Sequence, residues 1–135
     1  MAEEKDRYER GREVILDVWG REQGAAILAR WRDLSPDLER QIVEYMYGDR
    51  WGLSAPAPDL KTRSLVQVAT LAALGRATQL RVHLIGARRN GATEKEIVET
   101  ILQVGLLAGF PTSWDALAVC KEVFAELRGK TDAEG

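Results

Sequence analysis

The chain has one cysteine and one histidine among 135 residues, and this scarcity excludes several classes of site. Cys120 alone cannot form a disulfide within the chain or supply a Cys-x-x-Cys redox motif. Together with His83 it offers neither the number nor the spacing of ligands that a zinc site needs, so we expect no metal. A chain without paired cysteines suits a reducing compartment, and we expect a cytoplasmic protein.

Long apolar runs and an excess of one charge are also missing. The 19 basic and 21 acidic residues are interleaved and leave a net charge of −2, so we expect neither a nucleic-acid-binding nor a membrane-binding surface. No run approaches the ~18 apolar residues of a membrane span, and the charged N-terminal stretch does not resemble a signal peptide. A phosphate-binding loop and a nucleophile elbow are absent too.

The hydrophobic pattern has a helical period throughout and predicts an all-α protein. Ser35 and Pro36 mark one helix start, Thr93 and Glu96 form a capping box, and Gly109 marks a helix end. At 15.0 kDa the chain suits a single domain over residues 1–135 with mobile ends at 1–6 and 129–135. We expect helices over residues 6–20, 24–31, 35–48, 60–74, 76–89, 94–108 and 113–129.

Two segments stand out from this pattern. Residues 48–59 hold two prolines and two glycines and predict a loop, longer than most connections and therefore a candidate functional segment. The helix over 60–74 is apolar on nearly all sides and is expected to be central and buried. Because the helical segment over 97–108 is apolar in the same way, and a lone domain of this size has difficulty covering both, we expect a homo-oligomer.

Polar residues gather on two neighbouring helices. Arg76, Gln79 and His83 follow the i, i+3, i+7 spacing that places them on one helix face. On the preceding helix, Arg63 and Gln67 lie one turn apart. Two polar faces on adjacent, mostly apolar helices can converge on a small anion-binding pocket.

The walls of such a pocket would be aromatic. Trp51 and Asp49 of the predicted loop are candidates to close it, and so is Trp114 at the start of the last helix. Tryptophans more often pack against other residues than against ligands, so a purely structural role stands beside this one.

The polar residues have structural alternatives as well. A lone histidine such as His83 is often a satisfied core residue of intermediate burial. Arg63 can bond a loop carbonyl, and Arg76 can belong to a solvated face or a subunit salt bridge. Cys120 lies on an apolar stripe and is expected to be an inert core thiol. Spacing alone leaves the function open.

Three motifs carry a resemblance to a known family. The segments "YGDRW" at 47–51, "TRSL" at 62–65 and "LxxHxxGAxxNGATxxEI" at 80–97 resemble the carboxymuconolactone decarboxylase family, within the superfamily of the alkylhydroperoxidase AhpD. The similarity runs from about residue 8 to residue 124. It implies an all-α, AhpD-like helical domain with a central buried helix pair, assembled as a homohexamer that is a trimer of dimers.

The resemblance is to the cysteine-free branch of that superfamily. The peroxidase-like branch carries its Cys-x-x-Cys pair at the positions of Arg76 and Gln79, and a glutamate at the position of Ser64. The decarboxylase branch carries a glutamate at position 79, so Gln79 is a departure from its pattern. The implied chemistry is therefore decarboxylation rather than peroxide reduction.

The resemblance implies a cofactor-free decarboxylation of a γ-lactone dicarboxylate such as 4-carboxymuconolactone, giving an enol-lactone in aromatic-acid breakdown. His83 would be the general acid, with Gln79 beside it, because an imidazole titrates near neutral pH. Arg63 and Arg76 would hold the carboxylates, and the remaining substrate contacts would be Trp51, Asp49 and Trp114. Two alternatives stay open: another cofactor-free lyase, isomerase or hydrolase on the same scaffold, or a non-catalytic oligomer that binds a small acid.

Overall fold

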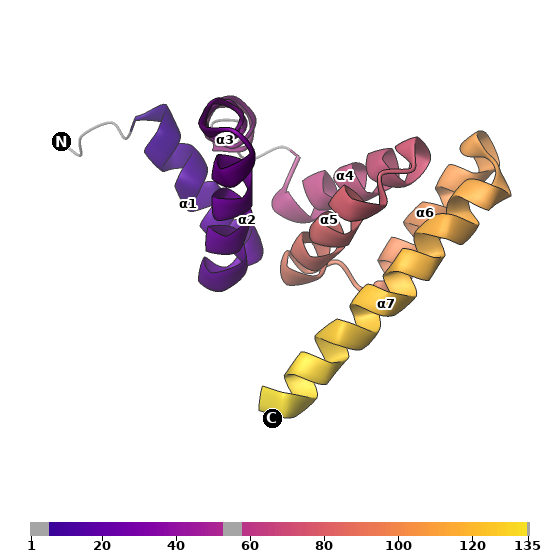
Figure 1. Cartoon of the computed structure of the whole chain (residues 1–135). Helices are drawn as coiled ribbons and strands as arrows, with labels where there is room; N and C mark the ends of the chain where they lie inside the picture. The colour runs from indigo at the N-terminus through magenta and orange to yellow at the C-terminus, as the bar shows by residue number, and fades with distance from the viewer. Residues whose placement is uncertain (1–5, 53–57, 135) are drawn as a thin grey trace. The chain divides into compact units, whose positions relative to one another are not determined.

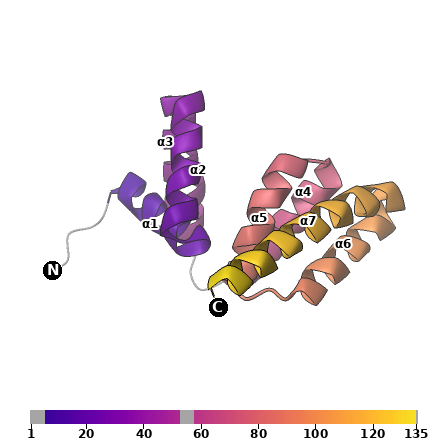
Figure 2. The ribbon, with the colours of Figure 1, turned by 60° about the horizontal axis from the view of Figure 1, so that its bottom comes forward.

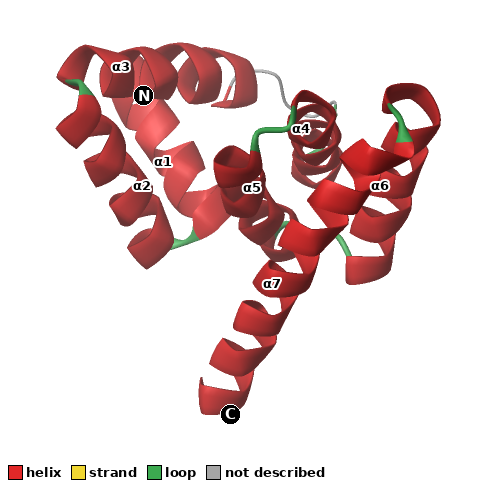
Figure 3. Cartoon of the chain, turned by 45° about the vertical axis from the view of Figure 1, so that its right-hand side comes forward, coloured by secondary structure: helices red, strands yellow, loops and turns green. Residues whose placement is uncertain are grey.

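The computed structural model describes residues 6–52 and 58–134, and every regular element in these ranges is a helix (Figure 3). The all-α prediction is confirmed. Among the described residues no helix is long and apolar enough to cross a membrane. The chain divides into two compact units, Met1–Asp59 and Leu60–Gly135, and each is described by itself. The single domain expected over residues 1–135 stays a prediction.

Local sequence signals set the helix starts of the first unit. The Asp6 side chain accepts a hydrogen bond from the backbone N–H of Glu9, and the Ser35 side chain accepts one from Leu38. Gly20, with φ of +83°, lies between the first two helices as the C-cap of one and the N-cap of the next. The second helix begins directly after it, at Arg21, and is therefore longer than the segment 24–31 expected from the sequence. The four helices are α1 (Arg7–Trp19), α2 (Arg21–Leu34), α3 (Pro36–Gln41) and the π-helix η1 (Ile42–Trp51).

Two glycines allow η1 to lie against α1 backbone to backbone. A Cβ added at Gly11 would lie 1.9 Å from the carbonyl oxygen of Val43, and one at Gly48 would lie 2.4 Å from that of Arg7. The helix ends in a bond from the N–H of Gly52 to the carbonyl of Tyr47, the i→i+5 pattern of a π-helix. Such helices are rare and often occur at functional sites.

The expected loop over 48–59 is therefore wrong at its start. Gly48 permits close packing rather than ending the helix, so the helix continues through Trp51. Residues 53–57 of the expected loop lie outside the described residues.

The second unit consists of two helical hairpins. Its helices are α4 (Leu60–Leu74), α5 (Ala77–Arg89), α6 (Glu94–Ala108) and α7 (Phe110–Glu134). Turns at Gly75, Gly91 and Gly109, each with positive φ, join them. In Figures 1 and 2, α6 and α7 run side by side; α4 packs on α5 and α6, and α7 packs on α5 and α6. The core between them includes Val68, Leu80, Leu84, Ile97, Ile101, Cys120 and Val123.

The last helix differs from its expected range at both ends. It begins at Phe110 with Pro111 in its first turn, a position where proline leaves no bond unmade. It continues through Gly129 to Glu134, so the segment expected as a mobile tail is helical. Its mobility stays a prediction.

The sequence predicted that α4 is central and buried, and the structure buries one of its faces. Only Ser64, Val68 and Ala72, one stripe of the helix, are buried, while Val66 and Leu74 are exposed. The same holds for α6, where Leu106 and Leu107 face outward. Both helices carry an apolar face that this chain alone does not cover.

Candidate active site

His83 lies on α5, and Gln67 lies on the preceding helix α4. The two helices pack against each other as a hairpin that turns at Gly75 and Arg76. The side chains of His83 and Gln67 are both half-buried. The two polar stripes expected from the sequence therefore run along adjacent helices of one hairpin.

Burial controls the protonation of His83. Removal of the imidazole from water disfavours its charged form and lowers the pKa of His83 to about 4. This lies below the near-neutral value expected from the residue type. At neutral pH the ring is therefore uncharged: it can accept a proton as a base, but it lacks the second ring proton that makes an imidazolium a general acid.

The other expected residues of this face differ in exposure. Gln79, one turn before His83 on α5, is exposed, whereas Arg63 on α4 is half-buried. Their roles at a substrate stay predictions.

Arg76 lies at a separate cavity. This cavity of about 330 Å³ is formed by the end of α4, the Gly75–Arg76 turn, the start of α5 and the start of α7. Arg76, Thr112 and Asp115 are its polar lining residues, and Gln79 and His83 are not among the residues that line it. The cavity therefore does not unite Arg76 with His83: Arg76 is the N-cap residue that precedes α5, whereas His83 lies within the helix.

The expected wall residues Asp49 and Trp51 have structural partners inside the first unit. Both carboxylate oxygens of Asp49 accept hydrogen bonds from Arg7, at 3.0 and 2.7 Å, and these bonds hold the pKa of Asp49 below its usual value. Trp51 packs on Tyr47 with ring centroids 5.2 Å apart. A contact of either residue with substrate stays a prediction.

The two remaining candidates on α7 have opposite environments. Trp114, a candidate wall residue, is 77% exposed, whereas Ser113 and Ala116 occupy the inward positions of that turn. Cys120 is buried, and burial raises the pKa of its thiol to about 11. This environment fits the inert core thiol expected from the sequence.

One polar contact near the site was missed by the sequence reasoning. Asn90, which follows α5, donates through Nδ2 to Oγ of the buried Ser64 on α4, with a distance of 3.0 Å. The bond ties the end of α5 to α4 and so limits rotation of the helix that carries His83. The sequence did contain a signal for this contact, because a serine in an otherwise apolar helix face needs a hydrogen-bond partner when it is buried.

In the described part of the chain, no group of three or more His, Cys, Asp or Glu side chains lies close enough together to hold a metal ion.

Comparison with known proteins decides the family. The model of the carboxymuconolactone decarboxylase family matches residues 36–122, which include the whole α4–α5 hairpin. The chain belongs to this family. The prediction made from the motifs at 47–51, 62–65 and 80–97 is confirmed.

Three relatives extend the match. The chain is 38% identical to a 4-carboxymuconolactone decarboxylase of Acinetobacter baylyi, over 92% of this chain and 91% of the relative. It is 28% identical to a nitrosuccinic acid decarboxylase of Metarhizium robertsii, over 91% of this chain and 85% of the relative. An uncharacterised 15.0 kDa protein of Paracoccus denitrificans is 34% identical over 69% of each chain. Two of the three are decarboxylases, which confirms the expectation of an enzyme of the carboxy-lyase class.

Proposed function

We propose that this carboxymuconolactone decarboxylase family member decarboxylates a γ-lactone dicarboxylate such as 4-carboxymuconolactone and releases an enol-lactone. The observation that carries the proposal is the 38% identity to a 4-carboxymuconolactone decarboxylase over nearly the full length of both chains. The half-buried imidazole of His83 on α5 supports the proposal because the reaction needs a group that can carry a proton.

The reaction requires a place for an electron pair and a source of a proton. The bond between the carboxylate carbon and the ring breaks, carbon dioxide leaves, and the electron pair delocalises into the lactone. A proton then returns to carbon, so that a dianion and one proton yield a monoanion and carbon dioxide. The proposal uses only side chains of the chain, with His83 as the proton carrier and Arg63 as a carboxylate partner.

The low pKa of His83 couples binding to protonation. In the free protein the imidazole is neutral because burial lowers its pKa to about 4. A bound dianion beside it favours the imidazolium and raises that pKa. Substrate binding should therefore be accompanied by uptake of a proton, which His83 then transfers to the product carbon.

A second candidate substrate class is an acyclic dicarboxylate. It is supported by the 28% identity to a nitrosuccinic acid decarboxylase over 91% of the chain. Both classes share two carboxylates and a leaving carbon dioxide. They differ in the group that accepts the electron pair, a lactone in one and a nitro group in the other.

The test is turnover of both substrates by the natural protein and by His83→Asn. Loss of lactone absorbance and release of carbon dioxide are measured under the same conditions. We expect His83→Asn to lower kcat roughly 100-fold, the usual size of an acid–base contribution, with helicity and oligomeric state unchanged. Absence of turnover of either substrate by the natural protein would contradict the proposal. Lower thermal stability with unchanged activity per folded molecule would make His83 a structural residue.

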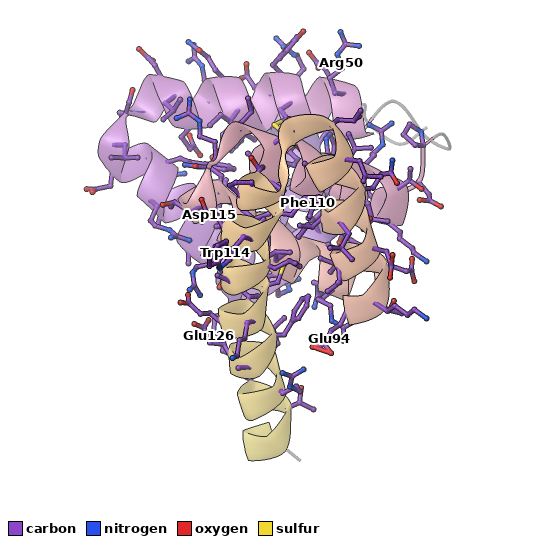
Figure 4. The ribbon with its side chains drawn as sticks, turned by 90° about the vertical axis from the view of Figure 1, so that its right-hand side faces the viewer. Arg50, Glu94, Phe110, Trp114, Asp115 and Glu126 are labelled. Carbon is purple, nitrogen blue, oxygen red and sulfur yellow. The ribbon has the colours of Figure 1, made fainter. Side chains whose placement is uncertain are left out.

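We also propose that the protein is a cytoplasmic homohexamer, built as a trimer of dimers. Support comes from an apolar surface at the turn between α6 and α7, which we call the α6–α7 corner: Leu102, Leu106, Leu107, Phe110 and Trp114. Phe110 and Trp114 extend from the first turns of α7 (Figure 4). Contiguous apolar surface of this kind commonly marks an interface, and one between copies would cover it.

A further inference from the structure

The cavity at the Gly75–Arg76 turn is lined by one positively charged and one negatively charged side chain that do not pair with each other. Its lining comes entirely from the second unit. Arg76 and Asp115 both line it, yet their charged atoms are not within the 4.0 Å of an ion pair, and neither side chain hydrogen-bonds to another described residue. Asp115 extends from the second turn of α7 (Figure 4).

Arg76 differs from the other described arginines of the second unit, which all have interactions with other residues. Arg81 is paired with Glu122 and Glu126, and Arg128 with Glu94. Arg88 donates to the carbonyl of Ala92, while Arg63 and Arg89 have other interactions. Among the described arginines of the second unit, only Arg76 has a guanidinium with all its donors available.

The polar groups of the cavity differ in charge and in hydrogen-bonding capacity. Arg76 offers donors and a positive charge, and α5, which begins at the next residue, has no side chain capping its N-terminus, so its first N–H groups add to the attraction for an anion. Asp115 offers acceptors. Thr112 donates its hydroxyl proton to the carbonyl of Ala108, so its oxygen can still accept a hydrogen bond. The lining thus offers a partner for a carboxylate in Arg76 and partners for an ammonium group in Asp115 and Thr112.

The rest of the cavity lining is mainly aliphatic. Leu71, Leu80 and Val119 contribute branched side chains, and the volume of about 330 Å³ is at the lower end of the range for small-molecule sites. A second carboxylate on the ligand would face Asp115 and be repelled. This separates the expected ligand from the dicarboxylates of the proposed reaction.

We propose that this cavity is an accessory site for a free amino acid with an aliphatic side chain, separate from the site of His83. The carboxylate pairs with Arg76, the ammonium group pairs with Asp115 and Thr112, and the side chain lies on the leucine and valine lining. The site requires no chemistry at the ligand and does not depend on the proposed decarboxylation.

The experiment compares L-leucine with its two half-ligands, 4-methylpentanoate and 3-methylbutylamine, on the full-length protein. The first lacks the ammonium group and the second lacks the carboxylate. Binding is measured by calorimetry and located through methyl NMR signals of Leu80 and Val119. We expect leucine to shift these signals and to bind about tenfold or more tightly than either half-ligand, because charge-assisted hydrogen bonds form at both ends.

Two variants and two matched controls complete the test. Arg76→Gln and Asp115→Asn should each weaken leucine binding about tenfold. Lys95→Gln and Glu99→Gln make the same charge changes at exposed positions of α6 outside the cavity, and they should leave affinity within about twofold. The proposal is overturned if leucine shifts neither methyl signal at about 10 mM, if either variant binds like its control, or if leucine binds no better than its halves.

Discussion

In the first unit, Glu39 is 4% exposed and accepts hydrogen bonds from both Tyr8 and Arg32, which come from α1 and α2. In the second unit, Leu107 is 91% exposed and Arg76 binds no other described side chain. The first unit thus satisfies even a buried carboxylate from its own residues. The second has apolar and charged groups that still lack partners, which is expected of the part of a protein that binds other molecules.

The two units also use glycine differently. In the first unit Gly11 and Gly48 are needed because another backbone lies where a Cβ would be. In the second unit Gly75 and Gly91 have positive φ and nothing within 4 Å of a built Cβ, so they serve turns rather than packing. Tolerance of substitution should differ accordingly.

Gly11→Ala should have the largest effect on stability. Its Cβ would lie 1.9 Å from the Val43 carbonyl oxygen, so backbone must move, and overpacking of this kind costs ~3 kcal/mol or more. The helix preference of alanine returns only ~1 kcal/mol. We expect a clearly lower free energy of unfolding, measured by chemical denaturation.

Gly129→Ala is the matched control, since Gly129 is also helical but has nothing within 4 Å of a built Cβ. It should be neutral or stabilising by up to ~1 kcal/mol. Equal effects of the two substitutions would show that the close approach of α1 and η1 is not needed for stability.

The sequence predicted the local structure of the helices but not the contacts between them. Caps at Ser35 and Thr93 predicted helix starts because the side chains that satisfy the first N–H groups are adjacent in sequence. Gly48 was misinterpreted as a stop, since its role depends on Arg7, 41 residues earlier. The spacing of His83 predicted the face it occupies, whereas its low pKa depends on burial by residues distant in sequence.

The same limit applies to Arg76. Its i+7 relation to His83 predicted that both lie on one helix face, but Arg76 precedes α5 as its N-cap residue and has a non-helical backbone, with φ of −91° and ψ of 75°. The cavity that Arg76 lines is completed by Thr112 and Asp115 of α7, and no spacing rule connects them to residue 76. Contacts between helices, rather than periodicity within one helix, decide which residues form a site.

The pH dependence of stability should distinguish the buried imidazole from surface charges. Burial lowers the pKa of His83 from 6.5 to about 4, so the unfolded chain binds the proton first as pH falls. Titration of His83 therefore leaves the free energy of unfolding unchanged above pH 6.5. Between pH 6.5 and 4 it lowers the free energy of unfolding, by at most on the order of 3 kcal/mol.

Unfolding free energies of the natural protein and of His83→Asn are compared across this range, because surface carboxylates contribute equally to both. We expect the difference between the two proteins to change with pH only between 4 and 6.5. A difference that does not vary would mean that His83 titrates normally in the folded protein.

Leu107→Asp should weaken association of the α6–α7 corner. A charge in place of an apolar side chain would have to be desolvated in an interface, and we expect the dissociation constant to rise about tenfold or more. Sedimentation velocity measures the change. Leu34→Asp is the control, because Leu34 is 75% exposed but lies on α2; if it dissociates the oligomer as strongly, the interface is elsewhere.

Gln79→Glu should have the smallest effect and the most specific one. Gln79 precedes His83 by one turn of α5, and an amide neither holds a charge nor exchanges a proton near neutral pH. A carboxylate there favours the imidazolium and raises the pKa of His83 from about 4. The rate of decarboxylation of 4-carboxymuconolactone should then rise a few-fold, on the order of one Brønsted-controlled step, and the pH optimum should move upward.

The pH–rate profiles of the natural protein and of Gln79→Glu measure both effects. Gln79→Asn controls for shortening and packing, since it adds no charge. If Gln79→Glu slows the reaction and leaves the optimum in place, His83 does not carry the proton, and the amide is the residue that this substrate requires.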